Sequence, residues 1–152
     1  MAKKPKAPKE VDVALPKTPT IDHPRPIPLG DVIGHERAVT VMQDALRSDR
    51  VHHCWVFHGP RGVGKFTAAL AFAATLLDPT TRQGSDGHFA CDPQSESQRL
   101  LASGTHPDLH IIVKELAKFH ADPEVRRKKL TTIPVDVLRD FLIEPAKLAP
   151  NL

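Results

Sequence analysis

Apolar residues recur at helical spacing in several stretches of this chain. The first stretch predicts a helix around residues 38–46, where five apolar positions form one stripe (Ala38, Val41, Met42, Ala45 and Leu46). Residues 65–77 are rich in Ala and Leu and predict a second helix, which Asp78-Pro79 would end. Near the carboxyl end, residues 132–145 predict a last helix, again with one apolar face.

Two short apolar runs predict strands. Residues 54–57 and 109–113 are continuously apolar or nearly so, which is typical of strands buried on both faces of a parallel sheet. Between them, residues 78–91 are interpreted as a polar loop. Asp92 is expected to cap a short helix with Pro93 at its first position, and Gly104 would close it. Residues 115–129 are charged and expected to be irregular or partly helical.

Charge and proline are concentrated at the amino end. The 152 residues carry a net charge of +3, and residues 1–28 hold six bases and three acids, so residues 29–152 are neutral. The same stretch holds seven of the 15 prolines. A segment this rich in Pro and Lys buries too little apolar surface to offset its ordering entropy. We interpret residues 1–28 as a disordered arm, and we do not expect the neutral body to bind DNA strongly alone.

The remaining composition excludes several classes. No stretch approaches the ~18 apolar residues of a membrane span, and the amino end lacks the apolar core of a signal peptide. We therefore expect a cytoplasmic protein with no membrane partner. Cys54 and Cys91 provide neither a disulfide framework nor the four ligands of structural zinc, even with His88 and His106 near Cys91 in the sequence. No zinc site is expected.

A phosphate-binding motif stands between the first predicted strand and the second predicted helix. Gly59-Pro-Arg-Gly-Val-Gly-Lys65 matches the G-x-x-x-x-G-K pattern, and its flanking elements are those that a P-loop requires. Glycines let the backbone wrap around phosphate, the helix N-terminus favours the anion, and Lys65 would reach the β- and γ-phosphates. The alternative is a glycine-rich turn without a ligand. The residues expected around the phosphates are Gly59, Pro60, Arg61, Gly62, Val63, Gly64, Lys65, Phe66 and Thr67.

One position departs from the motif. A Ser or Thr hydroxyl normally follows the lysine and binds Mg²⁺, but this chain has Phe66 there. Thr67 is rotated by roughly 100° around the helix and cannot simply substitute. The sequence predicts weak or Mg²⁺-independent binding of ATP and little hydrolysis, so the chain's own enzymatic activity is in doubt.

With these motifs in place, the chain resembles the bacterial clamp-loader ATPases, most closely the delta prime subunits of DNA polymerase III. The resemblance covers about residues 30–145. Five pieces carry it: Ile33-Gly34-His35, His53-Cys-Trp-Val-Phe57, the Gly59–Lys65 motif, Ser103-Gly-Thr-His-Pro-Asp-Leu109 and Ile133-Pro-Val-Asp-Val-Leu-Arg139.

The resemblance implies an α/β fold of the AAA+ type, a parallel sheet flanked by helices with nucleotide at the P-loop. It implies a place in a hetero-pentameric machine that opens the sliding clamp and sets it on primed DNA, with the other clamp-loader subunits as direct partners. Ile33 and Gly34 would lie on the adenine side. Delta prime subunits are largely rigid and non-hydrolysing, which agrees with Phe66.

Several parts of that family have no counterpart in these 152 residues: the Walker B strand, the sensor residues, the arginine finger, the lid and the collar. We therefore expect residues 29–152 to form the N-terminal part of an AAA+ domain, with unpartnered strands and marginal stability. The alternatives are a gamma-like clamp-loader ATPase, a small P-loop phosphotransferase, or an inactive truncated fragment. The ATPase would need a hydroxyl after Lys65, and the phosphotransferase would need acceptor-site arginines, of which residues 78–107 offer only Arg82 and Arg99.

Overall fold

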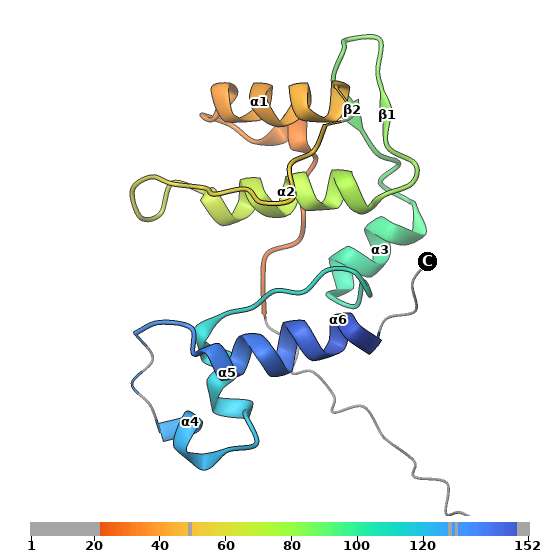
Figure 1. Ribbon diagram of the computed structural model, residues 1–152. Coiled ribbons are helices and arrows are strands. Elements are labelled where there is room, and N and C mark those ends of the chain that lie inside the picture. Colours follow the sequence, from red (N-terminus) through yellow and green to blue (C-terminus); the bar gives the residue numbers. More distant parts are fainter. Residues whose placement is uncertain (1–21, 49, 128, 130, 149–152) are drawn as a thin grey trace, which may run out of the picture.

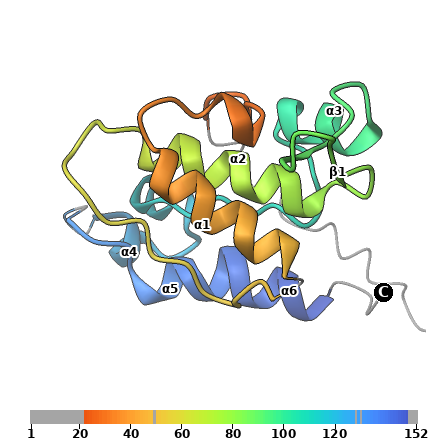
Figure 2. The same ribbon diagram turned by 90° about the horizontal axis from the view of Figure 1, so that it is seen from above.

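A computed structural model describes residues 22–148 except 49, 128 and 130 (Figure 1). In chain order its elements, with η for 3-10 helices, are η1 (Leu29–Asp31), α1 (Glu36–Arg47), α2 (Lys65–Leu77), β1 (Arg82–Gln83), β2 (Phe89–Ala90), α3 (Glu96–Ser103), η2 (Lys114–Phe119), α4 (Pro123–Arg127), α5 (Val135–Leu138), a π-helical segment (Arg139–Ile143) and α6 (Glu144–Leu148). Figures 1 and 2 show α1 lying along α2, while α4, α5 and α6 form a second group of helices on the other side of α2. No helix within these residues combines the length and apolar content needed to cross a bilayer.

The first hydrophobic cluster joins η1, α1 and α2. Leu29, Met42 and Phe72 are buried at its centre, and Trp55 packs edge-on against Phe72 with ring centroids 4.8 Å apart. The prediction of a helix at residues 38–46 is confirmed, but its buried stripe is rotated. The inward positions are Val39, Met42, Gln43 and Leu46, whereas Val41 is 57% exposed. This face presents the buried polar Gln43 to the β-hairpin, where its side-chain oxygen accepts the Phe89 N–H.

The predicted parallel sheet is not present in the described part of the chain. Residues 54–57 and 109–113 are extended but form no ladder with each other or with any other described residue. Residues 54–57 bury one side only: Trp55 and Phe57 pack against the first cluster while Val56 is 86% exposed. The prediction of two-sided burial was therefore wrong. An apolar run becomes a two-sided buried strand only when neighbouring strands supply its ladder hydrogen bonds.

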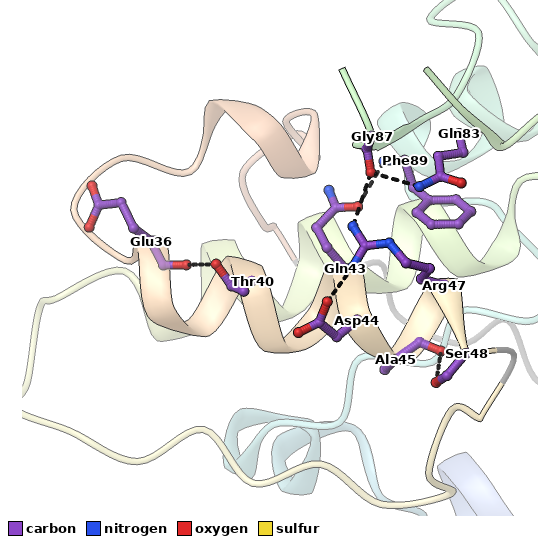
Figure 3. A network of polar contacts seen from close by, with 10 residues as sticks. All are labelled: Glu36, Thr40, Gln43, Asp44, Ala45, Arg47, Ser48, Gln83, Gly87 and Phe89. Atoms are coloured by element: carbon purple, nitrogen blue, oxygen red, sulfur yellow. Dashed lines mark hydrogen bonds and ion pairs between the residues drawn. The ribbon is translucent and has the colours of Figure 1, made fainter. Parts of the chain in front are cut away.

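The sheet that does form is a two-stranded antiparallel hairpin inside the predicted polar loop. β1 pairs with β2, with Arg82 opposite Ala90 and Gln83 opposite Phe89. Figure 3 shows how α1 holds this hairpin. The Gln43 side-chain oxygen accepts the Phe89 N–H at 2.7 Å, and the Arg47 guanidinium donates to the Gly87 carbonyl at 3.2 Å. Side chains of α1 thus provide contacts that so short a ladder cannot provide for itself.

The short helix after the hairpin begins later than predicted. Ser95, not Asp92, is the N-cap of α3, and its hydroxyl accepts the Gln98 N–H at 3.0 Å. Asp92 instead closes a turn through Gln94 N–H at 2.8 Å. Both residue types satisfy free N–H groups, so the sequence alone did not separate a capped turn from a capped helix. The end at Gly104 is confirmed, with φ of 69° in the left-handed region.

The last helix continues past Pro145 instead of ending near it. The run from α5 to α6 contains the π-helical segment, in which the Glu144 N–H bonds the Arg139 carbonyl five residues earlier. Pro145 is the second residue of α6, which follows the π-helical segment without a break, and its ring nitrogen donates no helical hydrogen bond. The wide turn resets the hydrogen-bond register so that the helix tolerates a proline.

A second hydrophobic cluster joins η2, α4 and α5. Leu116, Ala117, Val125 and Val137 are buried in it, with Ile112, Val113 and Phe141 packed around them. It shares no residue with the first cluster. The partly helical character predicted for residues 115–129 is confirmed by η2 and α4.

Most of the predicted disordered arm, residues 1–21, lies outside the described residues. Residues 22–28 have no regular secondary structure, but Ile27 already packs against the first cluster. Packing therefore begins before the predicted boundary at residue 29.

Candidate phosphate-binding site

Six of the nine residues predicted around phosphate, Gly59 to Gly64, form the loop between the extended segment 54–57 and α2, and the other three, Lys65, Phe66 and Thr67, begin α2. Gly62 and Gly64 have φ of 85° and 89°, in the left-handed region that a residue with a side chain rarely adopts. Gly64 is also the N-cap of α2, and its carbonyl accepts the first helical hydrogen bond, from Ala68 N–H at 2.9 Å. The sequence motif thus produces a tight turn that leads directly into the helix.

Lys65 folds back over this loop. Its Nζ donates to the Gly59 carbonyl at 3.0 Å and to the Pro60 carbonyl at 2.5 Å. These two bonds hold the ammonium group at the mouth of the loop, with the side chain half-buried. An ammonium carries three donors, so one remains after these two contacts.

The first turn of α2 is left open toward the same loop. The N–H groups of Lys65, Phe66 and Thr67 donate to no acceptor within the described part of the chain, and no side chain caps the helix. Unmade donors at a helix N-terminus favour an anion, because the helix dipole adds to their partial positive charge. The exposed Arg61 adds a cation to the loop.

Phe66 is 45% exposed and offers no oxygen to a metal ion. Thr67 is half-buried on the next position of α2. The loop therefore has the parts that hold phosphate but lacks the hydroxyl that a P-loop uses for Mg²⁺.

A pocket of about 280 Å³ adjoins the loop. Its wall is mostly apolar and comes from α1, the extended segment and the start of α2, with three cationic or polar side chains, His35, His58 and Lys65. No carboxylate within the described residues lines it. A pocket of this composition suits an apolar or aromatic group attached to an anion, but it holds no general base of the carboxylate type.

His35 reaches the loop from the start of α1, a contact that the sequence did not predict. Its Nε2 hydrogen-bonds the Val63 carbonyl, and a Cβ placed on Gly64 would lie 3.7 Å from the same nitrogen. The only sequence signal for this contact was that His35 belongs to the segment Ile33-Gly34-His35, which carries part of the family resemblance.

Ile33 and Gly34, predicted on the adenine side, lie away from the loop pocket. Ile33 is 92% exposed and lines a separate groove between η1, α1 and the hairpin. The Gly34 N–H donates to Glu36 Oε1 at 3.2 Å, within the turn that begins α1. In this structure only the third residue of that piece, His35, reaches the predicted site.

The residues considered for zinc do not gather. Within the described ranges, no three His, Cys, Asp or Glu side chains are grouped as metal ligands. Burial, with the nearby charge of Asp78, raises the pKa of the Cys91 thiol. His106 instead contacts α3: its Nδ1 accepts the Asp108 N–H at 3.2 Å, and its Nε2 lies 3.1 Å from the hydroxyl of Ser97. The same hydroxyl joins α3 to α2 by donating to the Leu77 carbonyl.

Comparison with known proteins gives one family and several relatives. The model of the family described as "DNA polymerase III, delta subunit" matches residues 34–146. A DNA polymerase III subunit delta' from Pseudomonas aeruginosa is 32% identical over 96 residues, which are 63% of this chain and 25% of the relative. A delta' subunit from Bacillus subtilis is 32% identical over 76 residues, covering 50% and 21%. A tau/gamma subunit from Haemophilus influenzae is 42% identical over 52 residues, covering 34% and 8%.

The matches thus span a quarter or less of the length of these relatives. No solved structure matches the chain significantly.

Proposed function

The chain belongs to the DNA polymerase III delta subunit family, and on that premise we propose that it acts in DNA replication as a delta prime-like clamp-loader subunit. Its role is to hold nucleotide phosphate, or to serve as a structural member, with little or no hydrolysis of its own. Its direct partners are other clamp-loader subunits, and through them the sliding clamp and primed DNA. The cytoplasm is the compartment that goes with this role.

The observation that carries the proposal is the geometry of the Gly59–Lys65 loop. This short stretch holds two glycines in the left-handed region, a lysine folded over the loop and, at the start of α2, three N–H groups without an acceptor among the described residues. Each of these features favours phosphate, and together they make an anion cradle. The adjoining apolar pocket supports a nucleotide over inorganic phosphate.

The proposal of weak catalysis rests on Phe66 and on the lining of the pocket. Without a hydroxyl after Lys65 the loop has no Mg²⁺ ligand, and no described carboxylate lines the pocket to activate water. A gamma-like ATPase remains the second candidate, because the tau/gamma relative has the higher identity of the three over its shorter match.

Titration of ATP into the full chain, with and without Mg²⁺, tests this function. We expect binding that Mg²⁺ changes by less than about threefold, and we expect Lys65→Ala to weaken it at least tenfold because the ammonium contact with phosphate is lost. Arg82→Ala is the matched control, since Arg82 is an exposed cation on the hairpin. Absence of ATP binding by the unmodified chain contradicts the nucleotide-binding role and leaves only the structural role.

Phe66→Thr tests the reason given for weak Mg²⁺ use. The new hydroxyl stands at the position that binds Mg²⁺ in a P-loop, so we expect ATP affinity to rise at least fivefold when Mg²⁺ is added. Phe66→Ala removes the ring without adding an oxygen and should show no such gain. An equal response to Mg²⁺ in both variants would show that Phe66 does not set the metal dependence.

A further inference from the structure

The His35 side chain makes one hydrogen bond in the described part of the chain, and that bond crosses 28 residues to the phosphate-binding loop. The acceptor is the Val63 carbonyl, which has no proton, so Nε2 must be the donor. The side chain has no capping role: the Val39 N–H bonds the His35 backbone carbonyl, and no side chain caps α1. Its described polar contact is therefore with the loop alone.

The hydrogen bond from His35 orients the whole Val63–Gly64 peptide group, not the carbonyl alone. A peptide group is planar and trans, so its C=O and the following N–H point in opposite directions. When the Val63 carbonyl is held toward His35, the Gly64 N–H is held facing away from His35. The side chain of the N-cap residue of α1 thus holds one loop amide in one direction.

Without that bond the same peptide group has freedom to turn over. Gly62 and Gly64 stand on either side of Val63, and glycine adopts positive and negative φ with similar ease. The first two carbonyls of the loop, of Gly59 and Pro60, are already held by Lys65 Nζ. The Val63 carbonyl receives its hydrogen bond from His35.

We propose that His35 is a positioning residue of the phosphate-binding loop, which holds the Val63–Gly64 peptide group in one orientation so that the Gly64 N–H is available to the ligand phosphate. Only the last step of this inference, the contact of the Gly64 N–H with a ligand phosphate, rests on the proposed function. His35, Val63 and Lys65 line one pocket, so the positioning residue and the cation of the loop share one cavity.

The test uses the full chain and two readouts. His35→Phe keeps a ring of similar size but removes the donor, and His35→Gln keeps an N–H donor. Nuclear magnetic resonance of the amide of Gly64 reports the peptide orientation without any ligand, and ATP titration reports the affinity. We expect His35→Phe to double or broaden the Gly64 signal and to weaken ATP binding about tenfold, while His35→Gln stays within about threefold of the unmodified chain.

His53→Phe is the matched control, because His53 is an exposed histidine with no hydrogen bond in the described residues and lines no pocket described here. A second donor-free variant, His35→Ala, gives the same readouts if the bulk of Phe disturbs α1. An unchanged Gly64 signal in both donor-free variants overturns the inference. If the unmodified chain binds no ATP, the proposed function fails, and the Gly64 signal still decides the positioning role.

Discussion

Asp78 is buried at the end of α2 and is the acceptor for four hydrogen bonds. They come from the Thr80 N–H and hydroxyl at 2.8 and 2.7 Å, the Ser95 hydroxyl at 2.6 Å and the Gln98 amide at 2.9 Å. Burial acts to raise the pKa of Asp78, but the four bonds to the charged form outweigh it and lower the pKa from 3.8 to about 2. The carboxylate therefore stabilises the junction of α2 and α3 while it is ionised.

This shift predicts the response of the chain to acid. Since the pKa of Asp78 is lower in the folded state than in the unfolded state, its contribution is complete above about pH 4 and is lost as the pH falls toward 2. We expect Asp78→Asn to lower the free energy of unfolding by about 2 kcal/mol at pH 6, because donors are left unpaired. Urea unfolding at several pH values should show this difference shrinking below pH 4.

The matched control is Asp108→Asn, at an exposed carboxylate whose side chain makes no hydrogen bond in the described residues. Its effect should stay below about 0.5 kcal/mol. A difference between Asp78→Asn and the unmodified chain that is constant from pH 6 to pH 2.5 would contradict the shifted pKa.

At the scale of elements, the N-cap of α3 differs between the sequence prediction and the structure. Ser95 caps α3 and also donates to Asp78, whereas Asp92 belongs to the preceding turn. We expect Ser95→Ala to lower the free energy of unfolding by about 1–2 kcal/mol, since both the cap and a buried hydrogen bond are lost. Asp92→Ala should cost less than about 1 kcal/mol. Chemical denaturation of both variants, with Ser95→Thr as the conservative control, measures the two losses of stability. A larger loss for Asp92→Ala than for Ser95→Ala would indicate that Asp92, the predicted residue, is the N-cap.

Helices were more predictable than strands for a physical reason. The residues of α2 make their own backbone hydrogen bonds, so its pattern, with Asp78-Pro79 after it, gave the observed bounds Lys65–Leu77. Residues 54–57 and 109–113 depend on neighbours for their ladder, and none is present among the described residues. The tail of the last helix was mispredicted because a π-turn before Pro145 is not visible in apolar spacing.

At the scale of the molecule, the two hydrophobic clusters predict two unfolding units. They share no residue, and the extended segments do not tie them together by ladder hydrogen bonds. Trp55, the single tryptophan, reports the first cluster. We expect Val137→Ala, in the second cluster, to lower the free energy of unfolding of that cluster by about 2 kcal/mol. The unfolding midpoint measured by circular dichroism should fall, while the midpoint measured by Trp55 fluorescence should stay unchanged.

Val135→Ala is the matched control because Val135 lies on the same helix and is 66% exposed. It should move neither midpoint appreciably. Equal shifts of both probes by Val137→Ala would show that the clusters unfold as one unit. Cooperative thermal unfolding together with good amide protection would argue against the marginal stability predicted for residues 29–152.

The sequence by itself determined the helices with a clear apolar face, the turn at Gly104 and the tight Gly59–Lys65 loop, because each depends on residues close together in the chain. The tertiary structure alone decided which side of α1 is buried, that Gln43 holds the hairpin, that Asp78 is a hydrogen-bonded centre and that His35 reaches Val63. The bonds of Gln43 to Phe89, Ser95 to Asp78 and His35 to Val63 join residues 17 to 46 positions apart, and each requires a matched direction as well as a matched residue type. Local periodicity carries no information about such directions, so they appear only when the elements pack.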